Sequence, residues 1–172
     1  MLRIETLNQT HKRKSFDCGN KLLNQYLQKM ARQHAVKGVA RTFVLIDDLY
    51  PSDIMGFFTL SICELHAEEL PNYYAKKYPR IVPAAKLARL AVHKAQQRQG
   101  LGNLMMTEAM QRVINVSEQV GIIGFLVDAK DEAAKRYYQR YGFLEFPKQA
   151  LKLFLPMETL KSAFERTKRQ DI

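Results

Sequence analysis

The sequence predicts an α/β (α+β) fold with a mixed central sheet flanked by helices. Segments of helical spacing and short apolar runs mix along the chain, and residues 86–155 follow the order strand, loop, helix, strand, helix, strand. No repeat, low-complexity tract or linker rich in glycine, proline or serine interrupts the 172 residues. We therefore expect a single domain spanning residues 1–172.

The N-terminal half predicts one helix followed by two strands. Leu22, Leu23, Tyr26, Leu27, Met30 and Ala31 recur at helical spacing after Phe16-Asp-Cys-Gly-Asn20. Prolines are frequent between residues 64 and 84, which favours a loop there. The expected elements are a helix from about Asn20 to Gly38, strands at Arg41–Ile46 and Ile54–Cys63, a turn at 47–53, and a long loop with one short helix at 64–84.

The C-terminal half alternates strands and helices. Gly142 follows the second helix where a left-handed cap is wanted. The expected elements are a strand at Lys86–His93, a helix from Gly100 to about Glu118, a strand at Ile122–Ala129, a helix from Asp131 to about Tyr141, a strand at Leu151–Leu155, and a C-terminal helix at about 157–169.

The composition excludes several classes of protein. Fractions of 47% apolar and 26% charged residues are those of globular chains and argue against disorder. No window holds the roughly 20 apolar residues of a membrane helix, and Met1-Leu-Arg-Ile-Glu-Thr6 does not resemble a secretory signal. Two cysteines make neither a disulfide framework nor, alone, a zinc site. We expect a cytoplasmic protein with no membrane partner.

The net charge of +10 points to polyanionic partners such as nucleic acid, or to a phosphorylated cofactor. The excess is largest in residues 1–50, which hold nine basic and four acidic side chains. Charge that serves only solubility is the alternative.

A strand that runs into a helix through two glycines is the most informative segment. In Ala88-Arg-Leu-Ala-Val-His-Lys-Ala-Gln-Gln-Arg-Gln-Gly-Leu-Gly-Asn103, the absence of Cβ atoms at Gly100 and Gly102 lets backbone N–H groups approach a phosphate at a helix N-terminus. Arg98 adds a positive charge. Met105 excludes the dinucleotide-binding pattern, and Asn103-Leu104 excludes a P-loop. A purely structural tight turn is the alternative.

Two motifs resemble the GNAT superfamily of N-acetyltransferases. Gln97-Arg-Gln-Gly-Leu-Gly102 is similar to its pyrophosphate-binding signature Gln/Arg-x-x-Gly-x-Gly/Ala, and Ala134-Lys-Arg-Tyr-Tyr-Gln-Arg-Tyr-Gly-Phe143 to its Ala-x-x-Phe-Tyr-x-x-x-Gly-Phe segment. The resemblance implies acetyl-CoA as cofactor and Tyr138 as the general acid, with Tyr137 expected in the core. The cofactor-binding residues that it implies are Leu90, Ala91, Val92, Gln97, Arg98, Gln99, Gly100, Leu101, Gly102 and Asn103.

A narrower resemblance, over about residues 5–160, is to the toxin branch of type II toxin–antitoxin modules. It implies acetylation of the α-amino group of aminoacyl-tRNA, which blocks translation, and a homodimer. It also implies a ribbon-helix-helix antitoxin, with operator DNA bound only through that antitoxin. Asp131 stands where many superfamily members have Asn. The segments that carry this resemblance are Phe16-Asp-Cys-Gly-Asn20, Arg41-Thr-Phe-Val44, Arg89-Leu-Ala-Val92 and Val127-Asp-Ala129.

The chemistry of such a reaction needs a neutral amine, a polarised carbonyl and a protonated leaving group. An α-amino group titrates at about 7.7–8.0, so no strong base is required. Glu64 and His93 are candidate bases acting through a water, and a structural role is expected for each. A backbone N–H of residues 90–93 is the expected oxyanion donor. Tyr138 is the expected proton donor.

Arg41 and Arg89 are the expected tRNA contacts, with a surface salt bridge as the alternative for Arg89. Histidines at 11, 34, 66 and 93 have no spacing suited to a metal site, so none is expected. Two other functions stay open. One is acetylation of a protein N-terminus, a lysine or a small amine, and the other is RNA binding without catalysis.

Overall fold

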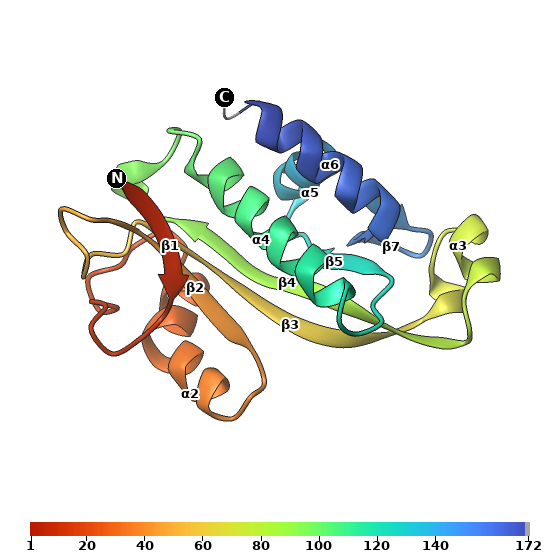
Figure 1. Cartoon of the computed structure of the whole chain (residues 1–172), viewed down its shortest axis with the longest axis horizontal. Coiled ribbons are helices and arrows are strands. Elements are labelled where there is room, and N and C mark those ends of the chain that lie inside the picture. The colour runs from red at the N-terminus through yellow and green to blue at the C-terminus, as the bar shows by residue number, and fades with distance from the viewer. Residues whose placement is uncertain (171–172) are drawn as a thin grey trace. The chain divides into compact units, whose positions relative to one another are not determined.

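The computed structural model describes residues 1–170 and contains a seven-stranded mixed sheet with helices (Figure 1). The strand order is β1-β2-β3-β4-β5-β7-β6. Strands β4 and β5 pair in parallel, whereas β1 with β2, β2 with β3, β5 with β7 and β6 with β7 pair antiparallel. The prediction of an α/β (α+β) fold with a mixed sheet is therefore confirmed.

The strands are β1 (Leu2–Thr6), β2 (Arg41–Asp47), β3 (Gly56–His66), β4 (Ile81–Val92), β5 (Gly124–Asp128), β6 (Leu144–Phe146) and β7 (Gln149–Pro156). The helices are α1 (Lys21–Gln25), the π-helical turn η1 (Tyr26–Met30), α2 (Ala31–Val36), the 3-10 turn η2 (Ala67–Glu69), α3 (Asn72–Lys77), the 3-10 turn η3 (Lys94–Gln96), α4 (Leu101–Ser117), α5 (Glu132–Gln139) and α6 (Met157–Gln170).

The chain divides into two compact units. Unit 1 comprises Met1–Ser61 and Ala88–Ala109, and unit 2 comprises Ile62–Leu87 and Met110–Ile172. Strands β3 and β4 and helix α4 each continue from one unit into the other. A single domain over residues 1–172 stays a prediction.

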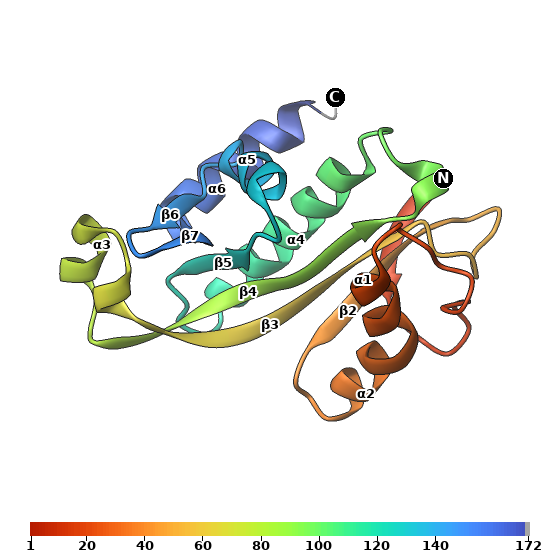
Figure 2. The ribbon, with the colours of Figure 1, turned by 180° about the vertical axis from the view of Figure 1, so that it is seen from behind.

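In unit 1, a helical arm formed by α1, η1 and α2 lies against the strands (Figure 2). The arm begins at Asn20, whose side-chain oxygen accepts the Leu23 N–H at 3.1 Å, and it ends before Gly38 at φ +73°. Both boundaries agree with the sequence. Burial of apolar side chains from the arm and the strands stabilises this unit. The core contains Phe16, Tyr26, Leu27, Ala31, Val44, Ile46, Ile54, Phe57 and Ala91.

In unit 2, helix α6 packs against β5 and β7. Helix α5 begins at Asp131, whose carboxylate accepts the Ala134 N–H at 2.8 Å, and the chain leaves it through Gly142 at φ +101°. Asp131 therefore has a structural role as a helix cap. The core of this unit contains Leu65, Leu70, Val82, Ala84, Leu126, Phe146 and Phe154.

The long loop expected at residues 64–84 is wrong at both ends. Strand β3 continues to His66 and β4 begins at Ile81, so the connection is shorter than expected. Pro83 does not prevent this, because it lies before Ala85, the first residue of β4 in register with β5. The short helix expected within the loop is α3.

Two strands were not anticipated from the sequence. Strand β1 pairs with β2 from Leu2 opposite Asp47 to Thr6 opposite Phe43, and β6 is a three-residue strand beside β7. None of the helices within residues 1–170 is long and apolar enough to span a bilayer.

Candidate active site

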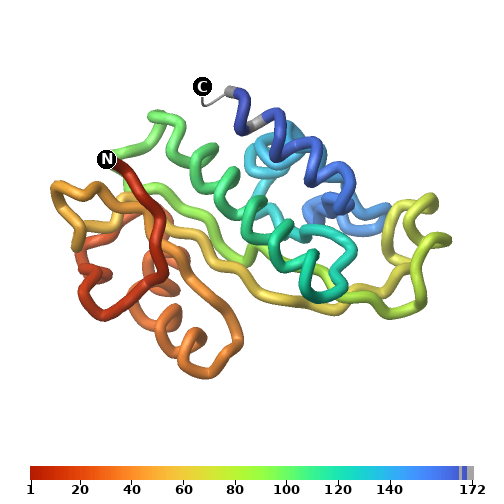
Figure 3. Tube along the Cα trace, viewed as in Figure 1, coloured from red at the N-terminus to blue at the C-terminus, as the bar shows by residue number. Residues whose placement is uncertain are grey.

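The chain between β4 and α4 makes a turn that can be followed in the Cα trace of Figure 3. Two residues of this turn have left-handed backbone conformations. Arg98 has φ +66° and Gly100 has φ +77°, whereas Gln99 between them keeps a negative φ. Arg98 is the one non-glycine residue with a positive φ in the described chain. Alternating handedness turns successive N–H groups towards a common concavity that binds anions. The strain at Arg98, roughly 1–2 kcal/mol, is of the kind that marks binding sites.

The backbone donors of this turn are free. The N–H groups of Gln97–Gly100 donate no hydrogen bond to any described residue. Helix α4 starts at Leu101, and the N–H groups of its first turn have no acceptor inside the helix. The positive end of a 17-residue helix thus adjoins a run of unpaired donors. This arrangement fits a phosphate or diphosphate group.

Gln97 has a second role that its motif did not indicate. Its side-chain Nε2 donates to the carbonyl oxygens of Cys18 at 3.0 Å and Val92 at 3.1 Å. These bonds attach the turn to the segment before α1 and to the end of β4. The side chains of Arg98 and Gln99 are exposed, and so are available to a ligand.

The cofactor-binding segment predicted at Leu90–Val92 lies at the end of β4, close to β3. A Cβ placed on Gly56 would lie 2.9 Å from the Ala91 carbonyl oxygen, so only glycine permits this approach. The His93 N–H donates to the Met55 carbonyl oxygen at 2.8 Å. The His93 N–H is therefore already used, and the candidates for the oxyanion donor are reduced to the backbone N–H groups of Leu90–Val92.

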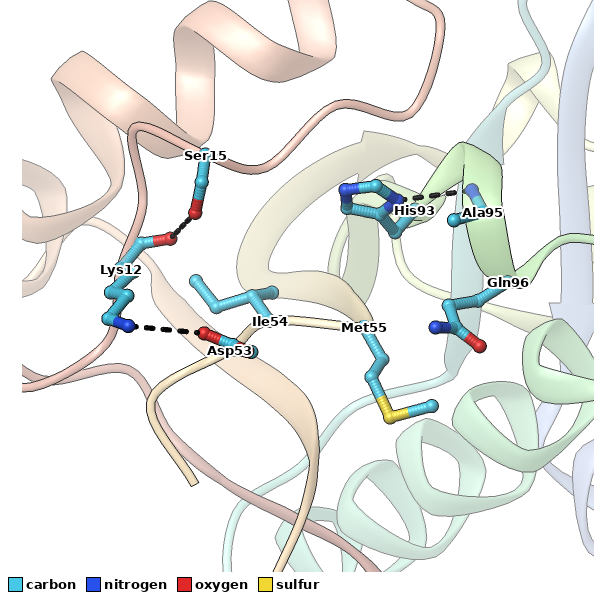
Figure 4. A pocket seen from close by; sticks show the side chains of 8 residues that line it. All are labelled: Lys12, Ser15, Asp53, Ile54, Met55, His93, Ala95 and Gln96. Carbon is cyan, nitrogen blue, oxygen red and sulfur yellow. Dashed lines mark hydrogen bonds and ion pairs between the residues drawn. The ribbon is translucent and has the colours of Figure 1, made fainter. Parts of the chain in front are cut away.

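A pocket of about 410 Å³ opens beside this turn in unit 1 (Figure 4). His93 Nδ1 accepts the Ala95 N–H at 3.1 Å, so the neutral ring carries its proton on Nε2. The ring also contacts Phe16 edge-on. The Nδ1 lone pair of His93 is therefore occupied and its Nε2 is a hydrogen-bond donor. This agrees with a structural role and disfavours His93 as a base. The lining residues are Lys12, Ser15, Asp53, Ile54, Met55, His93, Ala95 and Gln96.

In unit 2, an aromatic cluster surrounds the predicted general acid. The Tyr138 ring contacts those of Tyr137 and Phe143 with centroids 5.3 and 5.7 Å apart. The Tyr137 hydroxyl lies 3.2 Å from that of Tyr141, whereas the Tyr138 hydroxyl has no hydrogen bond to any side chain or backbone group that the structure describes. Burial, and to a lesser degree Tyr141, raises the pKa of Tyr138 to about 12. Tyr138 therefore stays a protonated, unpaired donor at neutral pH.

The two predicted tRNA contacts, Arg41 and Arg89, both lie in unit 1. Arg41 Nη1 donates to the Ala35 carbonyl oxygen at 2.7 Å, at the end of α2. The Arg89 guanidinium carbon lies 4.1 Å from the centroid of the Tyr26 ring. Neither arginine forms an ion pair with any residue that the structure describes, so the salt bridge considered for Arg89 is absent there.

The other candidate groups are dispersed. Glu64 is exposed on β3 in unit 2. His11 is buried against Glu5 at 2.7 Å, and His34 bonds to the Tyr26 hydroxyl. Within the described part of the chain no group of three or more His, Cys, Asp or Glu side chains could hold a metal ion.

The predicted site residues thus fall in both units. All ten predicted cofactor-binding residues, together with Arg41 and Arg89, belong to unit 1, and Tyr138 belongs to unit 2. Sequence reasoning missed Tyr26 and His34 as partners of a functional side chain. The helical spacing of apolar residues included Tyr26 only as a core residue, and it did not include His34.

Comparisons with known proteins show which proteins this chain is similar to. Residues 38–145 match the family model described as acetyltransferase (GNAT) domain. The tRNA-acetylating toxin of Mycobacterium tuberculosis (strain ATCC 25618 / H37Rv) is 30% identical over 86% of this chain and 87% of its own.

Two solved structures share the fold over nearly the whole chain. AtaT complexed with acetyl-methionyl-tRNAfMet has a TM-score of 0.87 at 28% identity, over 95% of this chain and 99% of that one. A mutant AtaT toxin bound to the C-terminus of the antitoxin AtaR and acetyl-CoA has a TM-score of 0.78 at 28% identity, over 95% and 98% of the two chains.

Proposed function

Since this chain belongs to the GNAT family of acetyltransferases, we propose that it is a toxin that acetylates aminoacyl-tRNA. It transfers the acetyl group of acetyl-CoA to the α-amino group of the amino acid, which blocks translation. The observation that carries the proposal is the run of unpaired N–H groups at Gln97–Gly100 before helix α4.

The residues of the β4–α4 turn fit the diphosphate of acetyl-CoA. The N–H groups of Gln97–Gly100 and of the first turn of α4 would hold its oxygens, and Arg98 would add positive charge. Leu101, Gly102 and Asn103 belong to that first turn. The backbone of Leu90–Val92 would contact another part of the cofactor. Acetyl-CoA, when bound, supplies an activated acetyl thioester.

The acceptor amine needs little help from the protein. An α-amino group has a pKa of about 7.7–8.0, so a sizeable fraction is neutral at cytoplasmic pH. Neither His93, held as a donor, nor exposed Glu64 is required as a base. Polarisation of the carbonyl falls to a backbone N–H of Leu90–Val92.

Tyr138 acts as the general acid. As the C–N bond forms and the C–S bond breaks, Tyr138 would donate its phenol proton to the departing sulfur; the proton lost by the amine would pass to solvent water, from which Tyr138 is reprotonated. The raised pKa keeps Tyr138 protonated until this moment. Tyr137 is the weaker candidate, because its hydroxyl already shares a hydrogen bond with that of Tyr141.

The charge of the protein supports tRNA as the acceptor. A net charge of +10 attracts a polyanion and repels a polyamine, and no acidic residue occurs between Asp17 and Asp47. Arg41 and Arg89 are the proposed tRNA contacts, since both lack a carboxylate partner among the described residues.

The likeness to toxin–antitoxin proteins extends the proposal to partners. A cognate antitoxin of the ribbon-helix-helix class neutralises the toxin, and operator DNA is bound only through it. The two units act as one GNAT domain spanning residues 1–172, as a homodimer in the cytoplasm. The family match over residues 38–145, which includes parts of both units, supports the single domain.

One experiment separates the proposal from its alternatives. The purified protein is incubated with radiolabelled acetyl-CoA and bulk charged tRNA, and in parallel with added protein or small amines. The labelled tRNA product is hydrolysed to identify its amino acid. Label in an N-acetyl amino acid released from tRNA supports the proposal. Label only in added protein or small amines assigns the enzyme to those acceptors, and tRNA binding without any label indicates an RNA-binding module.

A further inference from the structure

Arg89 is a partly buried cation without a carboxylate partner among the described residues. One of its five N–H groups, on Nη1, donates to the Ala88 carbonyl oxygen at 3.0 Å. Removing charge from water is unfavourable unless another group stabilises it. Because no described carboxylate stabilises the charge of Arg89, its other contacts must do so.

The guanidinium rests on Tyr26, a side chain only 3% exposed, at 4.1 Å from the ring centroid. A cation over an aromatic face is attracted by the ring, more strongly where water is excluded. Tyr26 opens η1, the π-helical turn that interrupts the arm. Such turns are rare and are frequently found at functional sites.

His34 fixes the orientation of that ring. Its Nδ1 lies 3.1 Å from the Tyr26 hydroxyl, and the two rings meet edge-on with centroids 5.4 Å apart. The Tyr26 ring is thus held by core packing on its body and by His34 at its hydroxyl. Core packing and the bond to His34 thus fix the Tyr26 ring, and the ring in turn fixes the position of the Arg89 guanidinium.

A guanidinium that lies over a ring still has N–H groups at its edge, and at Arg89 only Nη1 donates to a described residue, through the bond to the Ala88 carbonyl oxygen. That edge is the part that binds two phosphate oxygens at once. Arg89 directly precedes Leu90–Val92, the segment proposed to line the cofactor, on the same strand. Because the acetyl group is transferred from the cofactor, the acceptor end of the substrate must approach the Leu90–Val92 segment, next to Arg89.

We propose that Tyr26 and His34 are positioning residues that hold Arg89 ready to bind a backbone phosphate at the acceptor end of aminoacyl-tRNA. The ligand rests on the proposed function, whereas the pre-oriented arginine is a property of unit 1 alone. The stack supplies binding energy and orientation, and it takes no part in proton transfer.

Two variants and their combination test the proposal. Arg89→Ala should raise the KM for aminoacyl-tRNA by about tenfold or more, as expected for a charged hydrogen bond, and leave acetyl-CoA affinity unchanged. Tyr26→Leu should raise the same KM several-fold at nearly constant kcat. In the Arg89→Ala background, Tyr26→Leu should add nothing, because residues that act through one contact are not additive.

Conservative variants separate positioning from folding. Arg89→Lys should restore only part of the affinity, since lysine cannot offer the bidentate edge. Tyr26→Phe keeps the ring but loses the bond to His34, so its KM should lie between wild type and Tyr26→Leu. Leu27→Ala, in the same turn and fully buried, is the control for lost stability and should leave KM unchanged.

Binding of deacylated tRNA, followed by fluorescence anisotropy, keeps this test independent of catalysis. If wild type binds tRNA but acetylates none, the proposed function fails, and the effect of the variants on affinity still decides the role of Arg89. Unchanged tRNA affinity in Arg89→Ala overturns the proposal. An equal effect of Tyr26→Leu with and without Arg89 overturns the positioning role.

Discussion

The hydroxyls of Tyr137 and Tyr141 lie 3.2 Å apart, one helical turn from each other, and this pairing leaves Tyr138 as the unpaired phenol of the cluster. Two adjacent tyrosines of identical chemistry therefore differ in their hydrogen bonding. Tyr137 stabilises the end of α5, and Tyr138 offers a free proton.

This difference predicts that removing the Tyr138 hydroxyl lowers turnover, whereas removing the Tyr137 hydroxyl lowers stability. Tyr138→Phe should keep acetyl-CoA affinity and lower kcat by ~10²–10⁴-fold, the usual contribution of a general acid. Tyr137→Phe should cost about 1 kcal/mol of stability through its lost hydrogen bond and leave kcat near wild type. Single-turnover acetylation and thermal unfolding measure both. Near wild-type turnover in Tyr138→Phe would remove Tyr138 from the mechanism.

The left-handed turn predicts that Gly100 is needed for the cofactor. Gly100→Val should abolish acetyl-CoA binding in calorimetry while the protein stays folded, because no atom lies within 4 Å of the new Cβ. Gly38→Val is the matched control, since its φ of +73° is close to the +77° of Gly100 and its surroundings are equally open. Both should lose about 1–2 kcal/mol of stability, and only the first should lose the cofactor. Unchanged affinity in Gly100→Val would place the diphosphate elsewhere.

The raised pKa of Tyr138 predicts a pH profile with one limb. Below about pH 8 the acceptor amine is protonated, so kcat/KM should fall tenfold per pH unit on the acid side. Tyr138, with a pKa of about 12, stays protonated well above that point. The profile should therefore reach a plateau with no decline up to about pH 10, the usual pKa of tyrosine. A decline that begins near pH 8 would mean that a different acid donates the proton.

The helical arm contains no Asp or Glu, so we expect tRNA binding to weaken steeply with salt and this effect to depend on the lysines of the arm. Activity on aminoacyl-tRNA should drop tenfold or more between ~50 and ~200 mM salt, as phosphate contacts release counterions. Replacing exposed Lys29 and Lys37 by alanine should lower the slope of log affinity against log salt by up to about two. The same charge removed at exposed Lys161 and Arg166 of α6 is the control. Equal losses in both double variants would mean that net charge alone matters.

Local patterns were sufficient where neighbouring residues carry the information. Asn20 and Gly38 mark the ends of the helical arm, and Gly142 marks the turn after α5, because a capping side chain and a left-handed backbone act within one helical turn. The glycines of Gln97–Gly102 predicted a backbone cradle on the same basis. These features are written into consecutive residues.

Strand limits needed the tertiary structure. Strand β1 exists because β2 pairs with it, and β3 and β4 extend into a segment whose prolines suggested a loop. Strand pairing is decided by partners far along the chain, so local composition predicts it weakly.

The site shows the same division. By itself the sequence predicted a diphosphate site at Gln97–Gly102, and its resemblance to the GNAT superfamily indicated Tyr138 as the candidate acid. Only the folded chain decided that Tyr137 is bonded and Tyr138 is free, that His93 is a donor, and that Arg89 rests on Tyr26. A hydrogen bond or a ring contact depends on where two side chains lie in space, and for pairs as distant in sequence as Arg89 and Tyr26 no spacing rule predicts it.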